Sequence, residues 1–221
     1  MIGPMSDSPV VPDGSRSLLR TNRFEAFSDG VFAIAITILV LELGVPETAV
    51  EHPLQSVLDE WPTYVAYVVS FASVGALWLE HNAITEHLRF TDTALIRLNL
   101  LLLLLVSFLP FPTGLLSEFH GNSGAERVAV TFYGITLLAA STMISVLWRH
   151  AVCAGLIRED LSDEDAQALA KRLNPSLWAY FAIIVAGLVV PRLAVFGYLA
   201  VAVYLILPFE LFRRRRTTRE G

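Results

Sequence analysis

The chain has 221 residues, of which 54% are hydrophobic and only 17% are charged. Water-soluble domains carry about 25% charged residues, so we expect most of this protein's surface to face something other than water. The formal net charge of -5 says little about partners, because acidic and basic residues are segregated along the chain. The single cysteine, Cys153, excludes an internal disulfide and a cysteine-rich metal site.

The first 20 residues are rich in serine, proline and aspartate and contain no apolar core. They lack the hydrophobic region of a cleavable signal peptide, and we expect a disordered cytoplasmic tail over residues 1–20. Residues 213–221 form a second, basic tail that begins with Arg213–Arg216. An arginine run beside a membrane helix is typical of a topology signal that contacts anionic lipid. We therefore expect membrane lipids as partners and no nucleic acid.

A membrane-spanning helix needs about 20 mostly apolar residues, because its backbone polar groups must be satisfied within the segment. Six segments meet or approach this length, which predicts an all-α integral membrane protein with a six-helix domain over residues 21–212. The last two segments are short and are separated only by Pro191-Arg192, so a single kinked span or a re-entrant pair is the alternative. The six segments are Phe24–Leu43, Pro62–Ile84, Ala94–Leu116, Val128–Trp148, Pro175–Val190 and Leu193–Phe212.

The placement of basic residues favours six spans over five. Cytoplasmic flanks of membrane helices are enriched in lysine and arginine. With six spans and both ends inside, only Arg127 and Arg192 lie outside, which leaves 14 of the 16 basic residues in the cytoplasm. Merging the last two spans would put Arg213–Arg216 outside. The sequence thus predicts a multi-pass protein of the cell membrane with cytoplasmic N- and C-termini.

Local signals mark some helix ends. Trp61, directly before Pro62, is typical of an anchor at the membrane interface. Asn174-Pro175 predicts an N-cap followed by proline at the first helical position. The stretch Ser162–Asp165 resembles a capping box and predicts a short cytoplasmic helix that continues to Arg172.

The first span begins with the pattern R-x-x-x-F-S-D, formed by Arg23, Phe27, Ser28 and Asp29. An unpaired aspartate this close to hydrocarbon costs a few kcal/mol, so Asp29 needs a partner. The candidates at the same depth on the second and third spans are Trp78, His81, Arg97 and Asn99.

Apolar side chains form a stripe along this first helix. At about 100° per residue, Asp29 lies about 140° from Ile34, and Thr37 lies within about 60° of it. We therefore expect Asp29 to point into the helix bundle, away from the stripe. Taken alone, such a stripe is typical of core or lipid packing and does not demonstrate a pore. Its members are Phe27, Val31, Ile34, Ile38, Leu41 and Val45.

Three motifs carry a resemblance to a known family. The R-x-x-x-F-S-D entry, the following GVFAIAITILVLEL and the Leu-Pro-Phe-Pro-Thr of Leu109–Thr113 closely resemble the prokaryotic branch of the transmembrane protein 175 potassium channels. The animal lysosomal member has two six-helix repeats in a chain, and this chain has one. The resemblance covers the first three helices well, whereas the last three match only in number and hydrophobicity.

The resemblance implies a homotetrameric channel for K⁺ in which the first helices line the pore. In the family, rings of apolar side chains assisted by a hydroxyl form the constrictions. By position after the aspartate, the rings would be Ile34, Ile38 and Leu41, with Thr37 as the hydroxyl. The chain lacks a T-V-G-Y-G filter, and apolar rings discriminate by width and dewetting, so we expect modest K⁺ selectivity. No cofactor is expected besides the permeant ion.

The stretch from Leu41 to Trp61 contains Glu42 and four other acidic residues but no lysine or arginine. An acidic outer mouth would concentrate cations, although acids also remain outside simply because the bases are held inside. The resemblance further implies that Arg23, Phe27, Ser28 and Asp29 pack the first helix against its neighbours. Relatives commonly show a paired His or Asn-His where this chain has Glu80-His81-Asn82, which puts the details of that network in doubt.

Three other functions are considered as alternatives. A membrane enzyme could use the EHNAITEH stretch, but its histidines, His81 and His87, are about 240° apart on a helix and cannot both reach one ion. No H-E-x-x-H or G-x-S-x-G motif is present, so we expect no enzyme. A secondary transporter would need charges at mid-membrane or broken helices in corresponding halves, and a purely structural membrane protein is also compatible with the sequence.

Overall fold

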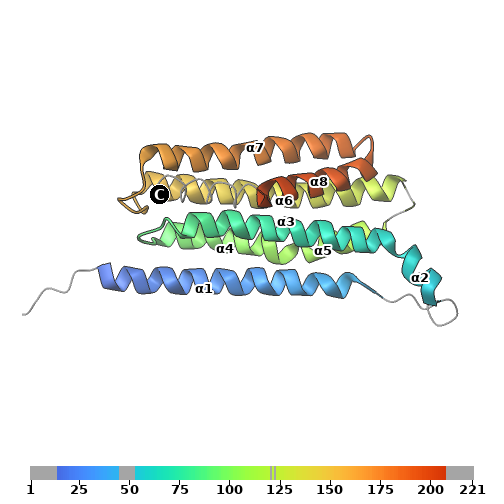
Figure 1. Ribbon diagram of the computed structural model, residues 1–221, viewed down its shortest axis with the longest axis horizontal. Helices are drawn as coiled ribbons and strands as arrows, with labels where there is room; N and C mark the ends of the chain where they lie inside the picture. The colour runs from blue at the N-terminus through green and yellow to red at the C-terminus, as the bar shows by residue number, and fades with distance from the viewer. Residues whose placement is uncertain (1–13, 45–52, 120, 122, 208–221) are drawn as a thin grey trace, which may run out of the picture.

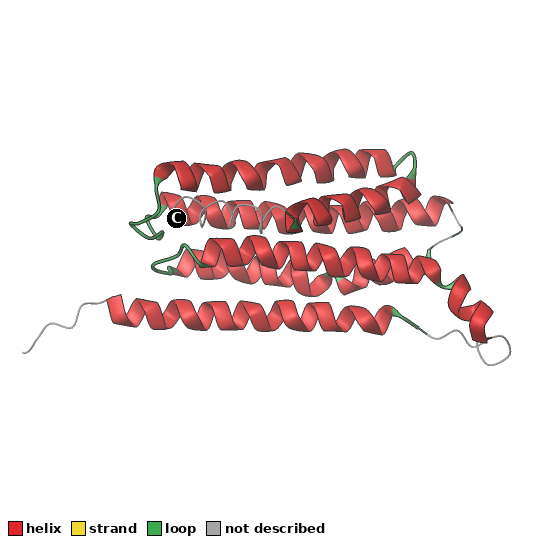
Figure 2. Cartoon of the chain, viewed as in Figure 1, coloured by secondary structure: helices red, strands yellow, loops and turns green. Residues whose placement is uncertain are grey.

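The computed structural model describes residues 14–44, 53–119, 121 and 123–207, and within these ranges all extended regular structure is helical (Figure 2). Four candidate spans are long and apolar enough to cross a membrane: Thr21–Glu42, Trp61–Thr85, Thr93–Glu118 and Ser123–Cys153. Two shorter apolar helices, Ser176–Gly187 and Pro191–Ile206, follow. The elements are α1 (Gly14–Ile38), the 3-10 helix η1 (Leu39–Glu42), α2 (Pro53–Asp59), α3 (Trp61–Thr85), α4 (Thr93–Phe108), α5 (Pro110–Glu118), α6 (Ser123–Cys153), α7 (Asp163–Gly187) and α8 (Pro191–Ile206).

The long helices lie side by side along the long axis of the molecule (Figure 1). α1 forms one edge of the bundle and contacts α3 and α4, while α7 forms the opposite edge and contacts α6 and α8. α3, α4 and α6 join the two edges. Among the described residues, α1 has neighbours on one side only, so this part of the chain leaves its other side uncovered.

Helix boundaries differ from the predicted ones at three places. α1 begins at Gly14 and so takes in part of the segment that we expected to be disordered. The predicted third span is divided into α4 and α5 at Leu109, because Pro110 has no N–H to donate and its ring is compatible only with a first helical turn. α2 was not predicted.

The prediction of a cap at Asn174-Pro175 is wrong. α7 runs without interruption from Asp163 to Gly187, so the expected cytoplasmic helix and the fifth span are one element. A proline removes one backbone hydrogen bond from a helix, and helices packed against neighbours tolerate this loss because other groups satisfy the freed carbonyl. α8 ends at Ile206, and the rest of the predicted sixth span lies outside the described residues.

Three buried tyrosines fill the centre of the second half of the bundle. The rings of Tyr133 and Tyr198 meet edge to face at 5.3 Å, and Tyr180 lies 6.4 Å from Tyr198. The Tyr198 hydroxyl donates to the Val130 carbonyl at 3.1 Å. Gly134 makes this approach possible, because a Cβ at that position would overlap the Tyr198 hydroxyl.

A buried chain of hydroxyls connects α3, α5 and α6. Thr113 on α5 donates to Ser70 on α3 at 2.7 Å, and Ser70 donates to the hydroxyl of Tyr133 on α6 at 3.2 Å. Tyr133 in turn donates to Ser73 at 3.2 Å. These bonds fix the position of α5, which the break at Leu109 would otherwise leave free to tilt.

The α3–α4 and α6–α7 loops pair at the end of the bundle. The backbone N–H of Arg89 donates to the Leu156 carbonyl at 2.8 Å, and the Arg89 and Glu159 side chains form an ion pair. Asp92 caps α4 by accepting from the Leu95 N–H at 2.7 Å, and it also contacts His150 at 3.0 Å. Burial raises the pKa of the Asp92 carboxyl, but these two contacts outweigh it and hold the pKa below its usual value.

Candidate functional site

α1, together with the 3-10 helix η1 that continues it, has two largely apolar faces that lie in different environments. One face packs into the bundle, and the other is exposed, although both are made of similar side chains. Val31 is half-buried between them, and Val45 lies outside the described residues. The buried face comprises Phe24 (9% exposed), Ser28 (0%), Phe32 (1%), Ala35 (2%) and Leu39 (0%). The exposed face comprises Phe27 (57%), Ile34 (60%), Ile38 (40%) and Leu41 (76%).

Thr37 lies beside the exposed face. Its hydroxyl donates to the Ile34 carbonyl at 2.9 Å and the side chain is exposed. This local bond occupies the hydroxyl proton and leaves the oxygen lone pairs free toward the space in front of α1. The structure thus brings Ile34, Thr37, Ile38 and Leu41 to one uncovered surface of the chain.

A buried polar group on the opposite face ties α1 to α3 and α4. The amide nitrogen of Asn99 donates to the Ser28 hydroxyl at 2.9 Å, and its amide oxygen lies 2.9 Å from His81 Nε2. An amide oxygen can only accept, so His81 Nε2 carries the proton in this arrangement. The His81 ring lies between Phe24 at 6.1 Å and Phe32 at 5.5 Å. This group holds one face of α1 in a defined orientation, and thereby also orients the exposed face.

The expectation that Asp29 points into the bundle is wrong. Asp29 is exposed, and its Oδ1 accepts a hydrogen bond from Trp78 Nε1 at 2.9 Å on the surface of the bundle. The inward position belongs to Ser28, since adjacent residues on a helix are rotated by about 100°. Trp78 was among the candidate partners of Asp29, whereas His81 and Asn99 serve Ser28.

The remaining motif and network residues do not join these contacts within the chain. The side chains of Arg23 and Phe27 are exposed in the described part of the chain, so their packing role stays a prediction. Arg97 is exposed as well, and among the described residues it forms no hydrogen bond or ion pair with Asp29 or Ser28.

Sequence reasoning missed the aromatic support of His81 and the hydroxyl chain at Tyr133. Phe24, Ser28 and Phe32 recur every four residues, which is a helix-face pattern. The pattern was hard to recognise because the other face of α1 is equally apolar. Thr113 belongs to the Leu-Pro-Phe-Pro-Thr motif and so was visible in the sequence. That Ser70 and Tyr133 bond with it could be seen only in the structure.

Glu42, expected at the outer mouth, lies at the end of η1 and is half-buried. Its carboxylate packs against Gly114 on α5, where a Cβ would overlap Glu42 Oε2. Gly114 follows the Leu-Pro-Phe-Pro-Thr motif directly, so this motif both breaks the third span and provides the surface against which Glu42 rests.

The histidines of the EHNAITEH stretch face different helices. His81 packs between two phenylalanines of α1, while His87 contacts Trp148 of α6 edge to face at 6.4 Å. His87 Nδ1 also lies 2.6 Å from the Ala83 carbonyl. The two rings therefore do not form a common site.

Comparison with known proteins gives a matching family and several relatives of this chain. A sequence model of the family described as endosomal/lysosomal potassium channel TMEM175 matches residues 23–110. A potassium channel of Chamaesiphon minutus is 42% identical over 164 residues, which cover 72% of this chain and 80% of that protein. A potassium channel of Streptomyces collinus is 39% identical over 158 residues, covering 71% and 76%.

The fold is shared as well. The crystal structure of a lysosomal potassium-selective channel TMEM175 homologue from Chamaesiphon minutus superposes with a TM-score of 0.78 and 36% identity, covering 86% of this chain and 97% of that one. The residues 23–110 that the family model matches include the first-helix motif and the residues that bond to it. The resemblance inferred from the motifs is therefore confirmed: this chain belongs to the TMEM175 family.

Proposed function

We propose that this protein is a potassium-permeable channel, not an enzyme, and that four copies assemble with their α1 helices around a common pore. The observation that carries the proposal is the exposed face of α1, where Ile34 is 60% and Leu41 76% exposed while the opposite face is almost fully buried. The names of the relatives, potassium channels from two bacteria, support the choice of ion.

The uncovered face suits a pore that several copies share. One chain cannot surround an axis with a single α1, because its α1 contacts α3 and α4 on one side only. Copies related by rotation would bring Ile34, Ile38 and Leu41 together as successive apolar rings, with Thr37 beside them. Apolar rings supply no ligands to replace the hydration shell of an ion, so selection by width and dewetting gives a modest preference for K⁺.

α1 begins with a segment that contains Arg16, Arg20 and Arg23, and η1, which continues it, ends at Glu42. We place the termini in the cytoplasm of a cell-membrane protein, because this orientation leaves only Arg127 and Arg192 outside. The four long candidate spans, with the apolar part of α7 (Ser176–Gly187) and with α8, would then make six crossings. Glu42 directly follows Leu41, at the outer end of the proposed pore lining, where its carboxylate would attract cations.

The test is passive K⁺ flux into liposomes that contain the purified protein and no energy source. We expect flux that follows the K⁺ gradient, rises linearly with ion concentration over a wide range and is smaller for Na⁺. Protein-free liposomes are the control. Flux that saturates as in a carrier, or no flux from a folded and assembled preparation, would contradict a channel.

A further inference from the structure

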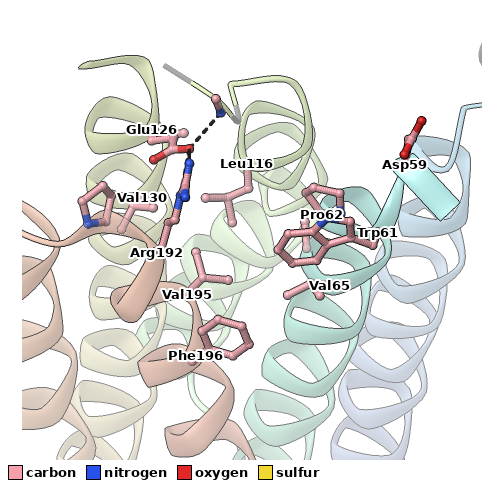
Figure 3. A pocket seen from close by; sticks show the side chains of 14 residues that line it. Asp59, Trp61, Pro62, Val65, Leu116, Glu126, Val130, Arg192, Val195 and Phe196 are labelled. Carbon is pink, nitrogen blue, oxygen red and sulfur yellow. Dashed lines mark hydrogen bonds and ion pairs between the residues drawn. The ribbon is translucent and has the colours of Figure 1, made fainter. Parts of the chain in front are cut away.

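A cavity of about 300 Å³ lies at the end of the bundle away from the N-terminus of α1 (Figure 3). α3, α5, α6 and α8 all contribute to its walls, so it is separate from the exposed face of α1. The volume is at the lower end of the range for small-molecule sites in proteins.

The cavity exists because one helical hairpin is short. The turn between α7 and α8 does not reach as far along the bundle as the start of α6 (Figure 1), and α8 begins only at Pro191. α3 and α6 continue past this level, to Trp61 and Ser123. The space between their ends is therefore not filled by a helix. α3, α6 and α8 all begin at this end of the bundle. In the topology proposed above, this end lies at the outer membrane–water boundary.

The walls are apolar and the mouth is charged. Val65, Val195 and Phe196 line the deeper part, whereas Pro62 and Arg192 lie nearer the opening (Figure 3). The Arg192 side chain is 75% exposed and reaches Glu126 Oε1 at 3.4 Å. The same oxygen accepts the Gly121 N–H at 2.8 Å, and Asp59 also borders the cavity.

We infer that this cavity binds one acyl chain of a phospholipid whose headgroup carries both a phosphate and a primary ammonium, as phosphatidylethanolamine does. The apolar walls accept the chain, and the guanidinium of Arg192 pairs with the phosphate. Glu126 and Asp59 give the mouth two carboxylates against one guanidinium, so a net anionic lipid is repelled and the ammonium of a zwitterionic lipid is attracted. The inference does not depend on the proposed channel activity.

The test measures which lipid stays bound. The protein is incorporated into vesicles of equal parts phosphatidylethanolamine, phosphatidylcholine and phosphatidylglycerol with the same acyl chains, extracted and weighed by native mass spectrometry. We expect phosphatidylethanolamine to be retained about tenfold over each of the others, since one charge-assisted hydrogen bond gained or lost changes binding by about this factor.

Two variants and one control locate the site. Arg192→Gln removes the phosphate partner and Val195→Trp fills the cavity, and each is expected to reduce retention about tenfold. Arg127→Gln changes an exposed arginine outside the cavity and should leave retention unchanged. Equal retention by Arg192→Gln and Arg127→Gln, or a preference for phosphatidylglycerol, would overturn the inference.

A measurement on the unaltered protein covers the case in which a variant does not fold. Phosphatidylethanolamine with a photoreactive group in its acyl chain should label peptides that contain Pro62–Ala66 or Pro191–Phe196. Labelling confined to other helices would reject the site.

Discussion

Adjacent residues of α1 have different tasks because a helix turns about 100° per residue. Ser28 is fully buried and bonded to Asn99, whereas Asp29 is exposed and bonded to Trp78. The serine is small enough to let α1 approach α4 closely, and it leaves no charge in the interior. The Asp29 carboxylate would cost more free energy to bury than the Ser28 hydroxyl. It remains at the surface, where the Trp78 indole donates one hydrogen bond to it.

Ser28→Ala should destabilise the folded chain by about 1 kcal/mol, because the Asn99 amide loses its buried acceptor. The measurement is the thermal unfolding midpoint in detergent. Ser107→Ala is the matched control, since Ser107 is exposed and its hydroxyl donates only to the Leu104 carbonyl of its own helix. Equal midpoints for the two variants would show that the Ser28–Asn99 bond contributes nothing.

Ile34→Asn should raise conductance and reduce the preference for K⁺ over Na⁺, because a polar ring wets an apolar constriction. Single-channel currents in planar bilayers measure both quantities. Val185→Asn places the same change on the exposed side of α7, away from α1, and should conduct like the parent. If Ile34→Asn also leaves permeation unchanged, Ile34 does not line the pore.

At the scale of helices, close contacts decide which elements can pack together. α6 approaches α8 through Gly134, where the Tyr198 hydroxyl occupies the space of a side chain. α5 is held by the Thr113–Ser70–Tyr133 hydroxyl chain after the break at Leu109. The second half of the bundle thus depends on small residues and hydroxyls as well as on hydrophobicity, as is typical where lipid removes the hydrophobic advantage of burial.

Gly134→Ala should lower the free energy of unfolding by about 1–3 kcal/mol, because the new methyl group forces α6 and α8 apart. Gly75→Ala on α3 is the matched control: its added Cβ meets nothing within 4 Å, and alanine favours a helix over glycine. Thermal unfolding of both variants gives the comparison. A stable Gly134→Ala protein would mean that Tyr198 moves aside without cost.

At the scale of the whole molecule, α1 is an edge helix with one face packed against α3 and α4 and the other face exposed, where we propose that other copies pack. The α1–α3–α4 contacts orient that second face, so in the proposed channel the polar group around Asn99 would influence the pore without touching an ion. The lipid cavity lies on the other part of the bundle, beside α8. Ion passage and lipid binding are therefore expected to respond to different substitutions.

Leu41→Cys in a Cys153→Ser background tests whether Leu41 lines the pore and how the chain is oriented in the membrane. Leu41 is 76% exposed and lies near Glu42, so a charged thiol reagent added outside should reach it and reduce K⁺ flux more than twofold. Val185→Cys in the same background is the control and should conduct unchanged after treatment. Faster block from the cytoplasmic side would reverse the assigned orientation.

Hydropathy, charge placement and three motifs determined the membrane location, the all-helical class and the family, because these depend on composition and local pattern. The sequence could not separate the two faces of α1, since Phe24 and Phe32 are as apolar as Ile34 and Ile38. Nor could it decide that Ser28 and not Asp29 points inward, that Asn174-Pro175 lies inside α7, or that Thr113 bonds to Ser70. Those outcomes depend on which helices lie next to one another, and only the tertiary structure brings together residues that are far apart in the chain.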